Sequence, residues 1–354
     1  MTNLTFILFL LIGYIFFCLS IIKSNKNTEI ILRFLFIIFF SFIAAFRFST
    51  VPDTEVYIKH YNDIATLSFS DFGFYYFEPG YVCLVKLYCK LLGGDCHSFF
   101  FFLTFINLII VSHSLNILYK KQYSLINISF LFFISYYGLY FNFIVLRFGI
   151  GASFFLCSLA YLKHKKIYSI LFYVLSIFCH ISFFLIFPIY IIILKYNNSK
   201  QKIFFYIWLL VIGIIYYFRI GRFLTNSLIQ IIILILKKIF LNYTYYFDNL
   251  DFGNEKISIR FTLNYILGFI FIRYGYIKNK TYLINSIIYL VGLSIYSFFS
   301  AIELIDRISD IYLLSGIFLI SNYFSSLKNI RDKLILFYPI CILNAIFAIR
   351  IINR

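Results

Sequence analysis

The chain has 354 residues, of which 62% are hydrophobic and only 13% are charged, and its mean hydropathy is +0.92. Soluble globular proteins are about 45–50% apolar and about 25% charged, so this composition excludes a soluble enzyme, a secreted disulfide scaffold and a disordered chain. The net charge of +17 does not indicate a nucleic-acid partner, because the basic residues lie mostly in short connectors between apolar runs. We therefore expect an all-α polytopic membrane protein that forms a single domain, 1–354.

Apolar runs of about the length that crosses a bilayer recur along the whole chain. They cover 4–22, 30–46, 97–119, 124–141, 143–162, 203–218, 259–277, 281–299, 308–324 and 334–350. The first run has no basic segment before it and no small-residue cleavage site, so we expect a retained helix rather than a signal peptide. The run 167–194 is long for one span and basic clusters flank it on both sides, which predicts two short arms that turn near His180. We expect a bundle of about 11–12 transmembrane helices.

Charge separates the two sides of this bundle. Most lysines and only two acids fall in six connectors, which the positive-inside rule assigns to the cytoplasm: 23–29, 120–123, 163–166, 195–202, 278–280 and 325–333. The other twelve acids lie on the opposite, outer side, and so do both termini in this arrangement. Two large loops, 47–96 and 219–258, are then on the outer side. Within the second, the apolar stretch 223–240 is expected to lie at the interface or to be re-entrant.

The first outer loop contains most of the polar candidates. Pro79 fits the first position of a helix, and an amphipathic run extends to Leu92, which predicts a helix along the membrane surface with Lys86 and Lys90 on one side. Glu78 is then either a general base or sugar ligand held near the bilayer, or a helix-capping acid. Asp53 with Glu55 is either a metal-binding pair or part of a solvated loop, and the loop is favoured for Glu55.

The seven cysteines show no metal-like spacing, and most lie in apolar segments, where they are expected to be buried hydrophobes. Cys83, Cys89 and Cys96 share one extramembrane stretch. A disulfide among them is the minority alternative, and free thiols are expected.

Arg147 is an intramembrane arginine with no acid within 40 residues on either side, so it is either functional or a snorkelling anchor. His180 is either a proton-transfer or anion-binding group at the tip of its hairpin, or a packed core residue. Arg307 has acids at i−4, i−1 and i+3, which indicates a helix-surface ion pair or a guanidinium held for phosphate. Arg260 is a weaker candidate and is favoured as an interfacial anchor.

Several arginines on the outer rim suit a lipid whose head group is a diphosphate, because guanidinium binds phosphate oxygens in a bidentate manner. Arg47, Arg147 and Arg307 are the candidates for this contact. Tyr57 and Tyr81, with other tyrosines of the outer loops, would suit stacking on a sugar ring. An interfacial tyrosine belt explains them equally well.

The order of these residues resembles the EpsG-like branch of the Wzy-type polysaccharide polymerases. The resemblance covers nearly the whole chain and is carried by Arg47, Asp53 with Tyr57, Glu78 with Gly80 and Tyr81, Arg147, His180 with Ser182, and Arg307. The chain departs from the pattern in having Phe148 after the intramembrane arginine, where a glutamine is expected, and Ile308-Ser309-Asp310 after Arg307.

This resemblance implies a GT-C-like membrane enzyme of the bacterial inner membrane that polymerises O-antigen or exopolysaccharide at the periplasmic face. The substrate would be an undecaprenyl-pyrophosphate-linked oligosaccharide, with no cofactor and no metal, and a Wzz-type chain-length regulator and a flippase would be partners. The catalytic residues would be Glu78, Asp53, His180 and Arg147. Arg47, Arg307, Arg260, Tyr57 and Tyr81 would bind the substrate. The alternatives are a lipid-linked oligosaccharide flippase or transporter, and a metal-using membrane glycosyltransferase that takes a polyprenyl-phosphate sugar.

Overall fold

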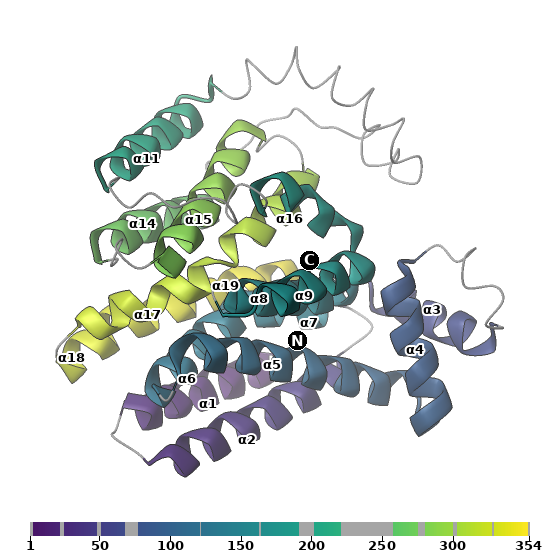
Figure 1. Ribbon diagram of the computed structural model, residues 1–354. Helices are drawn as coiled ribbons and strands as arrows, with labels where there is room; N and C mark the ends of the chain where they lie inside the picture. Colours follow the sequence, from purple (N-terminus) through teal and green to yellow (C-terminus); the bar gives the residue numbers. More distant parts are fainter. Residues whose placement is uncertain are drawn as a thin grey trace. The chain divides into compact units, whose positions relative to one another are not determined.

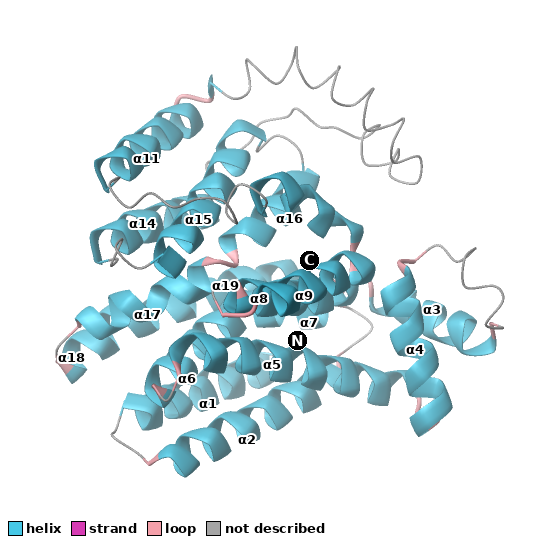
Figure 2. Cartoon of the chain, viewed as in Figure 1, coloured by secondary structure: helices cyan, strands magenta, loops and turns pink. Residues whose placement is uncertain are grey.

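The computed structural model describes residues 3–21, 25–47, 51–67, 77–120, 122–162, 164–190, 202–220, 258–274, 280–299, 303–327 and 329–352. These parts consist of helices joined by short connections, with no strand among the described residues (Figures 1 and 2). The predicted all-α class is confirmed. Most of the outer loop 219–258, including the apolar stretch 223–240, lies outside the described residues, as does most of the connector 195–202.

Most helices follow the predicted apolar runs, but the run 308–324 is divided between two helices, and two further helices lie in the first outer loop. Their bounds are α1 Asn3–Ile21, α2 Lys26–Ala45, α3 Thr54–Thr66, α4 Pro79–Leu92, α5 Cys96–Tyr119, α6 Tyr123–Phe133, α7 Leu139–Phe143, α8 Leu146–Tyr161, α9 Lys166–Cys179, α11 Lys202–Tyr217, α14 Ile259–Tyr274, α15 Lys280–Phe299, α16 Glu303–Leu313, α17 Gly316–Ser326, α18 Ile330–Asp332 and α19 Tyr338–Ile352. Two π-helical turns, η2 Ile134–Gly138 and η5 Lys333–Phe337, join α6 to α7 and α18 to α19, and a 3-10 helix, η3 Ile181–Ile186, follows α9. A helix satisfies its own backbone hydrogen bonds, which is why long apolar segments adopt it in lipid.

Five helices in the described part of the chain are long and apolar enough to cross a membrane. They are Lys26–Ala45, Cys96–Tyr119, Tyr123–Phe143, Tyr282–Phe299 and Ile335–Ile352. Arg307–Leu313 and Gly316–Ser326, which meet at a bend of 45°, count as a sixth if they form one broken span, and further apolar helices are 10–17 residues long. The chain is a multi-pass membrane protein, and the predicted total of 11–12 spans stays a prediction.

The helices pack as two compact units, each described by itself below. The first contains Met1–Phe184 and Phe324–Arg354, and the second contains Leu185–Tyr323. The prediction of one membrane domain, 1–354, is not tested by this division.

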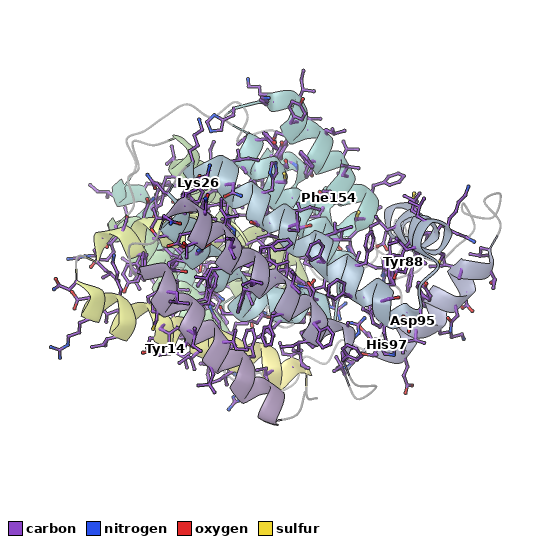
Figure 3. The ribbon with its side chains drawn as sticks, turned by 90° about the horizontal axis from the view of Figure 1, so that it is seen from below. Tyr14, Lys26, Tyr88, Asp95, His97 and Phe154 are labelled. Carbon is purple, nitrogen blue, oxygen red and sulfur yellow. The ribbon has the colours of Figure 1, made fainter. Side chains whose placement is uncertain are left out.

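In the first unit the long helices alternate in direction. The start of α5 lies at the end of α2, where His97 Nδ1 is 3.0 Å from the Ala45 carbonyl oxygen. At the other end of the same pair, Arg33 near the start of α2 donates to Asn116 near the end of α5, at 3.3 Å. Figure 3 shows the labelled Lys26 and His97 at opposite ends of these helices. We call the end that contains Ala45 and His97 the Arg47 end.

The opposite end of the first unit holds a buried polar network. Arg33 donates to Asn127 Oδ1 at 3.0 Å, and Asn127 donates to the Glu29 carboxylate. Ser169, near the start of α9, donates to the Ser158 carbonyl oxygen of α8 at 2.7 Å, so the connector 163–166 lies where α8 ends and α9 begins. His180, at the far end of α9, is therefore separated from that connector by the length of the helix, as predicted.

The helices α3 and α4 follow α2 in the sequence and precede α5. They pack against each other and against the start of α5 at the Arg47 end (Figure 1). The predicted helix at Pro79 is confirmed, with Pro79 in its first turn. Lys86 does not lie at a membrane surface: its side chain is buried, and its Nζ donates to the Ala65 and Leu67 carbonyl oxygens. It thereby satisfies carbonyl groups at the end of α3, a favourable place for a cation. Lys90 is exposed, as expected.

Candidate functional site

Glu78 directly precedes α4, at the position where a capping acid would lie. Its side chain makes no capping hydrogen bond to α4. Instead, its Oε2 forms an ion pair with Nη1 of Arg147, while its Oε1 is buried with no hydrogen-bond partner. A carboxylate with one oxygen held by a guanidinium and the other without a hydrogen bond has a defined orientation and a lone pair available for a proton.

Arg147 lies in the first turn of α8, directly after a break in the helical chain. Val145, with φ −110° and ψ 63°, separates α7 from α8 and aims the start of α8 at the Arg47 end. The guanidinium carbon lies 3.7 Å from the centroid of the Phe77 ring, and Nε is buried without a hydrogen-bond partner. A snorkelling anchor would extend its head toward water. Arg147 instead reaches a carboxylate 69 positions away in the chain.

His180 ends α9 at an extended residue, with φ −158° and ψ 119°. Its Nδ1 accepts a hydrogen bond from the backbone N–H of Ser182 at 3.3 Å, which assigns the proton of the neutral ring to Nε2. Nε2 lies 3.8 Å from Glu78 Oε1. The Phe148 ring packs edge-on at 5.2 Å from the imidazole, so the residue that departs from the family pattern holds His180 in place.

Arg47 follows α2 and is almost completely buried, with 4% of its surface exposed. Its Nη1 donates to the Phe143 carbonyl oxygen at 2.9 Å, and its guanidinium carbon lies 3.4 Å from the centroid of the Phe100 ring. Nε and Nη2 have no hydrogen-bond partner. Burial lowers the pKa of Arg47 to about 10, so it remains protonated at neutral pH. Arg47 is thus a buried cation with two unused donors.

Tyr57 and Tyr81 lie close enough to Arg47 and Arg147 to interact with them electrostatically. Their rings belong to the hydrophobic core around α3, α4 and α5, and neither has an exposed face on which a sugar ring could stack. The stacking interpretation of these two residues is therefore wrong for this structure. Burial raises the pKa of the Tyr81 hydroxyl well above its ordinary value, and that hydroxyl has no hydrogen-bond partner.

Asp53 and Glu55 are both exposed at the start of α3. Asp53 has a φ of +62° and makes no side-chain capping bond. This exposure fits the solvated-loop interpretation for both residues. No group of three or more His, Cys, Asp or Glu side chains suited to a metal occurs among the residues that the structure describes. Cys83, Cys89 and Cys96 are free, as favoured.

Two further residues adjoin the site and were not singled out from the sequence. Phe77 lies under the Arg147 guanidinium, and the His60 ring is centred 4.0 Å from that of Phe77. Burial lowers the pKa of His60, and the nearby Arg147 lowers it further. The sequence feature that could have identified His60 is its position three residues after Tyr57, near the buried face of an amphipathic helix.

Arg260 and Arg307 belong to the second unit. Arg260, in the first turn of α14, forms an ion pair with Asp310 of α16, a residue with 1% of its surface exposed. This pairing contradicts the interpretation of Arg260 as an interfacial anchor. Arg307 precedes Asp310 by three positions in α16, so both lie on one face of that helix.

The site at the Arg47 end thus brings together Arg47, Tyr57, Glu78, Arg147 and His180, contributed by segments that are far apart in the chain. No curated protein and no solved structure matches the chain. The profile of the EpsG family matches residues 30–354, which is nearly the whole chain and includes each of these five residues. The chain therefore belongs to the EpsG family, a Wzy-like family of polysaccharide polymerases.

Proposed function

We propose that this protein elongates a polysaccharide by transferring a glycan chain from a polyprenyl diphosphate to a terminal sugar hydroxyl of a second lipid-linked repeat unit. The reaction would take place at the periplasmic face of a bacterial inner membrane, with the undecaprenyl-linked oligosaccharide as substrate. A flippase would supply that substrate, and a Wzz-type regulator would set the chain length.

One observation carries the proposal: Glu78 Oε1 is buried without a hydrogen bond, Oε2 is held by Arg147, and His180 Nε2 lies 3.8 Å from Oε1. Glycosyl transfer to a hydroxyl needs a base of this kind. The acceptor oxygen attacks the anomeric carbon and its proton passes to Glu78 Oε1. The bond from that carbon to the diphosphate oxygen breaks, and the leaving diphosphate keeps the electron pair.

Arg147 and Arg47 would have different roles in this reaction. Arg147 is neutralised by Glu78 and orients its carboxylate. Among the described residues, Arg47 has two guanidinium donors without a hydrogen bond and makes no ion pair, although the exposed Asp53 acts on its charge. A buried cation of this kind is costly unless an anion joins it, and it suits the charge that develops on a departing diphosphate. Arg307 remains a candidate for the diphosphate, Arg260 remains a weaker one, and Asp53 remains a second candidate base.

Two other functions predict different behaviour. A transporter would move the lipid-linked oligosaccharide without changing its covalent structure. A glycosyltransferase that uses a polyprenyl-phosphate sugar with a metal on Asp53 and Glu55 would be inhibited by EDTA. Asp53 and Glu55 are both exposed at the start of α3, so they do not form a buried metal site and do not line a buried transport path.

The test uses the purified full-length protein in liposomes with a synthetic polyprenyl-diphosphate-linked oligosaccharide. We expect a ladder of longer glycans and one equivalent of polyprenyl diphosphate released per bond formed, with no effect of EDTA. Unchanged oligosaccharide that has crossed the bilayer would indicate the transporter, and loss of the ladder in EDTA would indicate the metal enzyme.

A further inference from the structure

The start of α4 and the end of α9 touch through their backbones. A Cβ placed on Gly80 would lie 2.6 Å from the Phe178 carbonyl oxygen, 2.8 Å from its carbonyl carbon and 3.0 Å from the Cys179 nitrogen. These are backbone atoms of a helix end, so they cannot move aside as a flexible side chain can. Only glycine permits this approach, although its own φ is not in the left-handed region.

The contact lies next to the proposed base. Glu78 is two residues before Gly80, and His180 is two residues after Phe178. The contact between residues 80 and 178 therefore fixes the separation of the two helix ends that carry Glu78 and His180. Glu78 Oε1 and His180 Nε2 lie 3.8 Å apart, an ion-pair distance that is longer than a hydrogen bond, so the backbone contact beside them limits how closely the two groups approach.

We infer that Gly80 is a positioning residue: its missing side chain lets α4 rest on the backbone of α9, and this contact sets the distance between Glu78 and His180. The role in catalysis rests on the proposed function, whereas the contact itself does not. Ordinary van der Waals contact begins at 3.4 Å, so an alanine at position 80 would push α4 away by up to 0.8 Å, the difference between 3.4 and 2.6 Å. A displacement of about 1 Å at a catalytic group can reduce the rate about 100-fold.

A native cysteine reports on this contact without any assay of function. Cys179 is 4% exposed and lies under α4, whereas Cys157 is fully buried in α8 away from α4. Reaction of both thiols with N-ethylmaleimide, read residue by residue by mass spectrometry of the full-length protein, separates local from global opening. In Gly80→Ala we expect labelling of Cys179 to rise at least tenfold with Cys157 still protected.

The same variant is then assayed for polymer in liposomes across a range of pH. We expect a loss of about 100-fold and a changed pH dependence of the residual rate, because Glu78 and His180 no longer face each other at the native distance. The matched control is Gly13→Ala, where the nearest atom is 3.8 Å from the new Cβ. Gly13→Ala should behave as wild type.

Each other outcome overturns the inference. Labelling of both cysteines would identify a folding role, and a protected Cys179 in Gly80→Ala would show that the backbones are not in contact. Exposed Cys179 with wild-type polymer would show that the contact does not position the site. If Glu78→Gln retained activity, the proposed function would lose its base, but the labelling result would still stand on its own.

Discussion

Glu78 before α4 and Arg147 at the start of α8 form an ion pair although 69 positions separate them in the chain. Each is mostly buried, with side-chain exposures of 11% and 20%. The pair carries no net charge, whereas the buried Arg47 makes no ion pair with a carboxylate in the part of the chain that the structure describes. The two arginines that the sequence places in one class therefore have different surroundings, and substitutions at each are expected to have different effects.

Arg147→Lys is expected to lose polymer almost as completely as Arg147→Ala. Lysine keeps the charge but cannot hold Glu78 Oε2 while lying flat on the Phe77 ring, as the planar guanidinium does. Loss of one charge-assisted hydrogen bond costs about 1.5–3 kcal/mol, or roughly one to two decades in rate if it is felt in the transition state. Polymer is measured as a ladder on gels, with protein level as the control. Full activity in Arg147→Lys would contradict a specific role for the guanidinium group and show that a positive charge at this position is sufficient.

Glu78→Gln is expected to abolish polymer and also to destabilise the protein, because Arg147 then lacks its carboxylate. Stability and function are separated by the double variant Glu78→Gln/Arg147→Met, in which no unpaired charge remains. We expect the double variant to recover thermal stability, by about 1–3 kcal/mol relative to Glu78→Gln, but no activity. The two readouts are thermal unfolding in detergent and the liposome assay. A wild-type ladder from Glu78→Gln would transfer the role of base to Asp53 or His180.

The stability of the α4–α5 connection is expected to depend on pH through Asp95. Its carboxylate accepts the Ser98 backbone N–H at 2.9 Å, and bonds with Ser98 hold the pKa of Asp95 below its usual value. A carboxyl whose pKa is depressed by folding stabilises the native state above its unfolded pKa, and this contribution is lost as pH falls through the folded pKa. The protection of amides at the start of α5 against hydrogen exchange, relative to their intrinsic exchange rates, should therefore decrease below about pH 4. Asp95→Asn, which can still cap the helix, should remove this dependence.

The sidedness of the site is tested by single cysteines in a cysteine-free background and a membrane-impermeant thiol reagent. Leu91→Cys on α4 should be labelled from outside intact cells, and His164→Cys between α8 and α9 should not. Asn198→Cys, beyond the described residues, should also be protected because the second basic cluster is predicted to be cytoplasmic. Labelling of Asn198→Cys from outside would contradict the predicted hairpin at His180.

Much of the fold could be predicted because apolar length determines membrane helices nearly by itself. The run 97–119 became α5 at Cys96–Tyr119, and 203–218 became α11 at Lys202–Tyr217. The break at Val145 could not be placed from the sequence, since Val145 lies within the predicted apolar run 143–162, whereas the polar residue between the two predicted runs is Asn142. The prediction that Lys86 lies at the membrane surface was wrong. The amphipathic pattern predicts that a charged side chain is exposed, but the carbonyl groups at the end of α3 accept hydrogen bonds from Lys86 and make its burial favourable.

The side chains that lie together at the Arg47 end could be singled out from the sequence, but their pairing could not. Glu78, Arg147 and His180 stand out as polar groups in or beside apolar sequence. Their contacts depend on how α4, α8 and α9 pack, and no local pattern encodes that packing. The same limit applies to Tyr57 and Tyr81, whose rings belong to the core although loop tyrosines are commonly interfacial.

Arg47→Leu is expected to leave the protein as stable as the wild type, or more stable, while abolishing polymer. A buried charge without a counter-ion is unfavourable, and replacing it by an apolar side chain removes that cost at the expense of one hydrogen bond to Phe143. If Arg47 served only to hold α2 against α7, its loss would lower the unfolding temperature instead. Arg47→Lys is the matched variant: it keeps the charge but not the two unused donors Nε and Nη2, so it should also lose most activity. Added diphosphate should raise the unfolding temperature of the wild type but not of Arg47→Leu. A lower unfolding temperature in Arg47→Leu together with a normal ladder would make Arg47 a structural residue and assign the diphosphate to another arginine.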